Sequence, residues 1–139
     1  MERLDLPASR NEDWRPTIEL IYAGGDLPPI NHIRMQWRLY EGAPGDPLFD
    51  IEAVAFEDVA ASADEIASGA AQAGDRILRL FPGIGVPAMQ TLPSGLNQPE
   101  PGEADRFVWD AVIFYEDGLN ERAIGGFVYV EKGVTLSGD

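Results

Sequence analysis

The sequence predicts an all-β fold, a sandwich or a barrel, made of roughly six to eight short strands. Three observations support this fold class. Apolar and polar residues alternate with a period of two in several short runs. Clusters of Gly, Pro, Asp and Asn separate these runs. A chain of 139 residues that is 45% hydrophobic is large enough for one domain with its own core.

The chain begins with a polar segment that shows little periodicity. We therefore expect residues 1–13 to be an N-terminal arm or a disordered start, and residues 14–139 to be a single domain. The first strand is expected over 17–22, where β-branched and aromatic residues alternate with polar ones. The glycines and prolines over 23–29 then end this strand.

The clearest strand of the sequence covers residues 33–40. Ile33, Met35, Trp37 and Leu39 point to one face, and the other face carries polar side chains that include Arg34 and Arg38. Such alternation is typical of a sheet with one face in water. A turn over 42–47 follows, and a third strand is expected over 48–56.

Residues 57–74 are rich in alanine and lack aromatic residues after Phe56. Ser62 and Glu65 fit a capping box, which indicates a short helix at about 63–73, with a loose loop as the alternative. Residues 76–81 predict the next strand. Residues 82–105 contain five prolines, so we expect an irregular connection with one short extended piece at 88–92, and long connections of this kind often make contacts.

The C-terminal third predicts the strands that complete the fold. Residues 107–115 are apolar on both faces, as expected for a central strand, and an Asp-Gly hairpin over 116–121 leads into a strand over 123–130. A last short piece over 132–136 either pairs at an edge or leaves the domain. Arg38 and Asp110 lie inside strands, and we hypothesise that they form an ion pair that fixes strand order.

Charge and composition exclude several function classes. The net charge of −14 opposes binding to nucleic acids and to anionic membranes, and no apolar run is long enough to span a membrane. The absence of cysteine excludes disulfides and thiolate sites. The mixed-charge start lacks the apolar stretch of a secretory signal, so we expect synthesis in the bacterial cytoplasm.

Residue patterns for chemistry are largely missing. His32 is the single histidine, and no serine lies in a nucleophile elbow. No spacing typical of metal ligands occurs, although loop carboxylates leave weak calcium binding open. Adjacent acidic pairs are expected by chance among 24 acidic residues. We therefore expect no enzyme activity, no catalytic residues, no cofactor and no metal.

Candidate contact residues are aromatic or apolar side chains that the strand pattern does not use. Trp37 and Trp109 lie in phase with apolar strand faces and are expected in the core. Trp14 precedes the first strand and is the better candidate for a role outside the core. In the proline-rich connection we expect exposed apolar side chains to contact a partner. The partner-contact candidates are Trp14, Ile84, Val86 and Met89.

The order of several short motifs resembles a known family. The motifs are Glu12-Asp13-Trp14-Arg15, Gly25-Asp26 with Ile30, Met35-Gln36-Trp37-Arg38, Leu92-Pro93, Phe107-Val108-Trp109-Asp110, Gly126-Phe127-Val128-Tyr129-Val130 and Gly133-Val134-Thr135. Together they resemble the small immunoglobulin-like domains of tailed-phage virion proteins, such as the N-terminal domains of baseplate and receptor-binding-protein adaptors. The likeness spans roughly residues 11–136, and the segments 57–74 and 94–105 depart from it.

The resemblance implies an antiparallel immunoglobulin-like β-sandwich in a phage or prophage particle. It implies a non-enzymatic structural protein of the capsid, neck or tail, located in the virion. The partners would be other virion proteins, in a homo-oligomer or a multi-copy assembly, with no nucleic acid and no membrane. The alternatives are a bacterial carbohydrate- or peptide-binding β-sandwich module and, with least support from the residues, an enzyme on a β scaffold.

Overall fold

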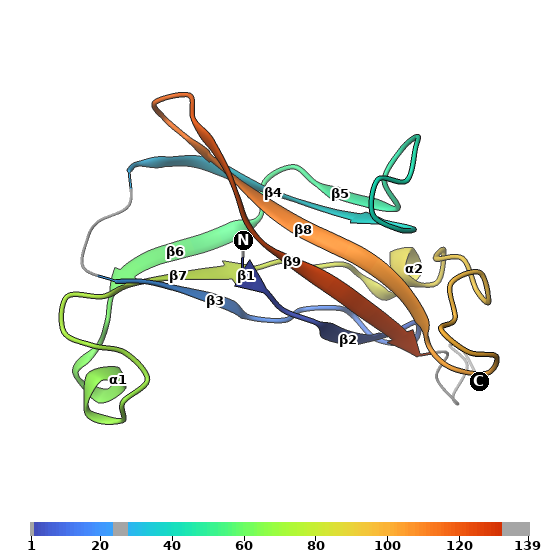
Figure 1. Ribbon diagram of the computed structural model, residues 1–139, viewed down its shortest axis with the longest axis horizontal. Coiled ribbons are helices and arrows are strands. Elements are labelled where there is room, and N and C mark those ends of the chain that lie inside the picture. The colour runs from blue at the N-terminus through green and yellow to red at the C-terminus, as the bar shows by residue number, and fades with distance from the viewer. Residues whose placement is uncertain (1, 24–27, 132–139) are drawn as a thin grey trace.

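The computed structural model describes residues 2–23 and 28–131, and its main feature is two β-sheets that lie face to face (Figure 1). The larger sheet has the strand order β1-β9-β8-β4-β5, and β2 also pairs with β9. Its strands are β1 (Glu2–Arg3), β2 (Leu6–Ser9), β4 (Ile30–Arg38), β5 (Phe49–Ile51), β8 (Asp105–Tyr115) and β9 (Asn120–Glu131).

The smaller sheet has three antiparallel strands in the order β3-β7-β6. They are β3 (Ile18–Tyr22), β7 (Arg76–Phe81) and β6 (Ala55–Ala60). Two short helices lie outside the sheets, α1 (Ala63–Ala67) and α2 (Val86–Met89). The expected all-β class is confirmed.

The core lies between the two sheets and uses the apolar faces that the alternation predicts. Both layers contribute fully buried side chains, as expected for sheets that pack on each other. Trp37 lies near the middle, with Trp14 and Phe49 in edge-to-face contact at ring-centre distances of 4.9 and 5.1 Å. Trp109 is also buried. The expected core positions of Trp37 and Trp109 are therefore confirmed.

The N-terminal residues are part of the larger sheet, so the expectation of a free arm over 1–13 is wrong for the residues described. Strands β1 and β2 pair in parallel with β9, which makes this sheet mixed and not wholly antiparallel. Gly126 permits the approach, because a Cβ atom there would lie 2.2 Å from the backbone oxygen of Leu4. The indole Nε1 of Trp109 also donates to that oxygen, at 3.1 Å.

A buried ion pair fastens the end of the N-terminal segment. Arg10 Nη2 lies 3.0 Å from Asp105 Oδ2, and the side chains are 11% and 0% exposed. Arg10 also donates to the backbone oxygens of Leu92 and Pro93. Asp105 accepts from the backbone N–H groups of Gly95 and Asn97. The pair thereby joins the N-terminus, β8 and the proline-rich connection.

The strand expected over 48–56 is two strands in different sheets. Strand β5 pairs with β4, and after a bend at 52–54 the chain enters β6, which pairs with β7. Val54 is buried at this crossing, and its N–H donates to the backbone oxygen of Ile33 at 2.8 Å. Residues 53–56 are all apolar, so the sequence shows no polar turn residue at the change of sheet.

The helical predictions are partly correct. The Ser62–Glu65 capping box is present, but α1 ends at Ala67 and not near 73. The extended piece expected at 88–92 is wrong, because α2 covers its first part. Pro87 lies in the first turn of α2, where the missing N–H costs nothing, so proline begins this helix and does not prevent it.

Three expectations involve residues outside the described ranges. They are the short piece over 132–136, its Gly-Val-Thr motif and the Gly25-Asp26 motif. Within residues 2–23 and 28–131, no helix has the length and apolar character needed to cross a membrane.

Candidate binding site

Three of the four expected contact residues are buried. Trp14 is 4% exposed, Ile84 6% and Met89 0%. Trp14 and Ile84 form a small antiparallel bridge with each other, and the Trp14 Nε1 donates to the backbone oxygen of Pro7. The expectation that these three side chains are exposed is therefore wrong, because all three belong to the hydrophobic core.

Val86 is half-buried, and its role as a contact residue stays a prediction. Its backbone N–H donates to Asp13 Oδ1 at 2.8 Å, which ties the start of α2 to the segment before Trp14.

The outer face of the larger sheet gathers most of the arginines. This face is opposite the core, and the side chains that alternate with the buried ones point from it into solvent. Five of the nine arginines in the sequence belong to it, although the whole chain carries a charge of −14. They are Arg3 on β1, Arg34 and Arg38 on β4, Arg106 on β8 and Arg122 on β9.

A hollow of about 470 Å³ lies on this face. Three arginines, two acidic residues and two aromatic residues line it, together with smaller residues. The charged or aromatic residues are Arg3, Arg38, Arg122, Glu41, Asp110, Trp109 and Phe127. A hollow that combines an apolar ring with a few polar groups suits a small ligand or the side chains of a partner.

Phe127 positions two guanidinium groups. The guanidinium carbon of Arg3 lies 4.7 Å from the ring centre, and that of Arg106 lies 4.4 Å from it. Both distances are within the range of cation–π attraction. The ring of Tyr129 contacts Phe127 at 6.3 Å, which supports the ring from the side.

Arg38 is held by uncharged acceptors. Its Nη1 donates to the backbone oxygens of Ala43 and Gly45, at 3.2 and 2.9 Å, and its Nη2 lies 3.3 Å from Gln36 Oε1. The predicted Arg38–Asp110 ion pair is wrong, because Asp110 Oδ2 instead accepts from Arg122 Nε at 2.9 Å. That bond joins β8 to β9.

The arginines of this face fall into two groups. Arg122 is paired with Asp110, and Arg34 is paired with Asp50 through two hydrogen bonds, one of them 2.8 Å long from Nε to Oδ1. The hydrogen bond from Arg34 is the main cause that lowers the pKa of Asp50. Across residues 2–23 and 28–131, Arg3, Arg38 and Arg106 have no ion pair.

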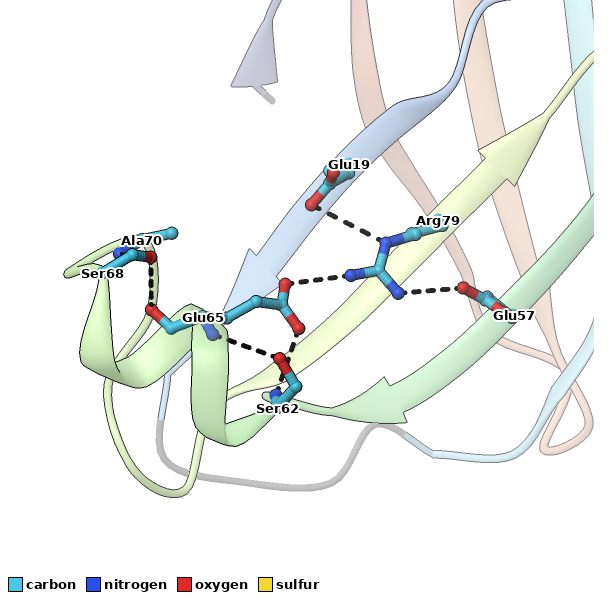
Figure 2. A network of polar contacts seen from close by, with 7 residues as sticks. All are labelled: Glu19, Glu57, Ser62, Glu65, Ser68, Ala70 and Arg79. Atoms are coloured by element: carbon cyan, nitrogen blue, oxygen red, sulfur yellow. Dashed lines mark hydrogen bonds and ion pairs between the residues drawn. The ribbon is translucent and has the colours of Figure 1, made fainter.

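Arg79 of β7, on the outer face of the smaller sheet, is neutralised by nearby carboxylates. Figure 2 shows Glu19, Glu57 and Glu65 pointing toward the guanidinium of Arg79 from β3, β6 and α1. The nitrogen–oxygen distances are 3.8, 2.9 and 2.9 Å. The three carboxylates neutralise Arg79, and the Glu65 contact fastens α1 to the sheet, so we interpret the cluster as structural.

Comparisons with protein-family models, with curated proteins and with solved structures found no match. Among the described residues, no three His, Asp or Glu side chains are grouped so that they could hold a metal ion.

Sequence reasoning missed the hollow, although one signal pointed toward it. The alternation over 33–40 correctly places Arg34 and Arg38 on a wet face. Arg3 lies in the segment expected as an arm, and Arg122 lies between the expected hairpin and the expected strand over 123–130. Their approach to Arg38 depends on the pairing of β1, β9 and β8.

Proposed function

We propose that this protein is a non-enzymatic structural component of a tailed-phage or prophage particle, and that it acts by contact with neighbouring virion proteins. The immunoglobulin-like character of its two-sheet fold belongs to the same proposal. The sequence motifs support it, and several of those within the described residues contribute side chains to the core: Trp14, Met35, Trp37, Leu92, Phe107, Trp109, Val128 and Val130.

The observation that carries the contact function is the arginine-rich outer face of the larger sheet. Arginine is enriched at protein interfaces, because its planar group makes several hydrogen bonds and also packs on aromatic rings. Arg3, Arg38 and Arg106 combine these properties at one place, beside Phe127. A face of this composition suits a contact with another protein.

The test is a mass-spectrometric inventory of purified particles from the source strain. The proposal predicts that peptides of this chain co-purify with capsid and tail proteins at a constant ratio through a density gradient. Particles that contain the other structural proteins and lack this chain would contradict it.

The alternative function is a carbohydrate- or peptide-binding module. The mixed lining of the hollow favours it to some degree, because Phe127 offers a ring and Gln36 and Asp110 offer polar groups. A glycan array that shows binding lost on Phe127→Ala would favour this alternative. No signal from the array, together with the chain present in particles, would favour the structural role.

A further inference from the structure

We propose that the hollow on the larger sheet, together with Arg106 on the adjoining ring of Phe127, is a docking site for an acidic segment of a different protein, with partner carboxylates bound by Arg3, Arg38 and Arg106. This inference rests on the proposed function and names the chemistry of the partner.

The charge distribution is the first argument. The chain carries 24 acidic and 10 basic residues. If these residues were spread at random over the surface, most surface regions would be negatively charged. The outer face of the larger sheet instead carries five arginines, and three of these have no carboxylate partner within the described part of the chain. Elsewhere the same chain neutralises Arg79 with three glutamates.

The three guanidinium groups are held in place before any ligand arrives. Arg3 and Arg106 lie on the ring of Phe127, and Arg38 is fixed by backbone oxygens of the turn at 43–45. Pre-positioned groups lose less conformational entropy on binding than free side chains do. Guanidinium groups bind carboxylates with two parallel hydrogen bonds, which gives such sites their selectivity.

The lining of the hollow favours a protein segment over a nucleic acid. Asp110 and Glu41 line the same hollow as Arg3 and Arg38. A regular row of phosphates would meet both carboxylates, and the net charge of −14 would repel it at longer range. A peptide can place single carboxylates on the arginines and apolar side chains beside Phe127.

Net charge also favours a different protein over a second copy. Two copies of this chain would approach with a charge of −14 each, and such self-repulsion opposes association. A partner with a local acidic segment and a smaller net charge would meet less repulsion. Electrostatic complementarity of this kind contributes mainly to association rate and to specificity.

The experiment measures fluorescence anisotropy with the full-length chain and three labelled probes of equal length. The first probe is a peptide of alternating Glu and Leu, the second has Gln in place of Glu, and the third is a single-stranded oligonucleotide. We expect the acidic peptide to bind at least about tenfold more tightly than either other probe, and to weaken as salt is raised.

Three variants locate the binding. Arg3→Ala and Arg106→Ala are exposed changes, and each should weaken binding of the acidic peptide about tenfold, as expected for loss of a charge-assisted hydrogen bond. Arg15→Ala is the matched control, because Arg15 is 73% exposed, pairs with its neighbour Asp13, and neither lines the hollow nor lies on the ring of Phe127. It should leave binding unchanged.

Several results would overturn the inference. They are no binding of the acidic peptide at millimolar concentration and low salt, equal binding of the Gln peptide, tighter binding of the oligonucleotide, or equal loss with Arg15→Ala. Self-association that disappears in Arg3→Ala would also overturn it, in favour of a second copy. If the peptide fails to bind while particles contain the chain, the inference fails and the proposed function stands.

Discussion

Asp105 illustrates how one residue can join three distant segments. Its carboxylate is fully buried and binds Arg10, while backbone N–H groups of the proline-rich connection occupy its remaining positions. Removing one charge of a buried pair leaves the other charge without a partner, and this costs more than the pair contributes. We therefore expect Asp105→Asn to lower the free energy of unfolding by about 3 kcal/mol, measured by urea denaturation.

The matched control for this change is Asp46→Asn. Asp46 is exposed in the turn after β4, so its substitution should change the free energy of unfolding by less than about 0.5 kcal/mol. Equal and small effects of the two substitutions would show that the buried pair does not hold the connection.

Trp14 distinguishes a core role from a contact role. Its ring packs on Trp37, its Nε1 binds Pro7, and 4% of its surface is exposed. Truncation of a buried tryptophan typically costs about 3–5 kcal/mol, so Trp14→Ala should lower the urea midpoint strongly. A variant with wild-type stability would support the earlier expectation that Trp14 lies outside the core.

Tyr22 gives a prediction at alkaline pH. Burial, and next the nearby Glu121, raise the pKa of Tyr22 to about 12. A raised pKa in the folded state means that the unfolded chain loses the proton first. The contribution of Tyr22 to stability is therefore complete below the ordinary tyrosine pKa of 10.0 and is lost as pH rises toward about 12. Burial also raises the pKa of Tyr115. An absorbance titration of tyrosinate should therefore show a late component whose amplitude Tyr22→Phe reduces and does not abolish.

At the scale of elements, the contact between β1 and β9 depends on small residues. A Cβ atom at Gly126 would lie 2.2 Å from the backbone oxygen of Leu4, which is too close for any rotation to relieve. We expect Gly126→Ala to displace the segment 2–9 and to cost about 1–3 kcal/mol, as overpacking usually does. Hydrogen–deuterium exchange should show faster exchange at residues 6–9 and little change in β4.

Gly83→Ala is the control for this experiment. Nothing lies within 4 Å of a Cβ atom at Gly83, so the added methyl group meets open space. If both variants leave exchange in the N-terminal segment unchanged, the parallel pairing of β1 and β2 with β9 is wrong.

Glu65 stabilises helix α1 through the capping box, so the stability of the helix depends on pH in the acidic range. The backbone N–H of Ser62, then its hydroxyl, and finally Arg79 lower the pKa of Glu65 below the ordinary glutamate value. The contribution of Glu65 is present above the unfolded pKa and is lost as pH falls through the lower folded pKa. In an NMR titration of its side-chain carboxyl carbon, Ser62→Ala should raise this pKa. An ordinary pKa in the wild type would contradict the capping box.

The elements differ in how well their sequences predict them. The strands β3, β4, β7, β8 and β9 have strand-like sequences and lie near their expected positions, and β4 shows the clearest alternation. Leu4, Leu6 and Ala8 of the N-terminal segment pack against the core with a period of two, but this run is short and contains Pro7 and Asp5, so it did not predict the pairing of β1 and β2 with β9. The change of sheet at 52–54 and the proline-initiated α2 depend on tertiary contacts that local patterns do not record.

At the scale of the whole molecule, the hollow could be predicted only in part. The alternation of apolar and polar residues in β4 predicts a solvent-facing side of this strand, and it places Arg38 there. The gathering of Arg3, Arg106 and Phe127 beside it requires the order β1-β9-β8-β4, which a single sequence does not specify. The predicted Arg38–Asp110 pair failed for the same reason, since β9 supplies a nearer partner in Arg122.

The central claim is that the arginine-rich face of the larger sheet contacts a neighbour in the assembled particle. Arginine footprinting with phenylglyoxal, read by mass spectrometry on the free chain and on intact particles, tests it most directly. We predict that Arg3, Arg38 and Arg106 react in the free chain and are protected in particles, whereas exposed Arg15 reacts in both. Particles that lack the chain, or in which these three arginines stay as reactive as in the free chain, would contradict the claim.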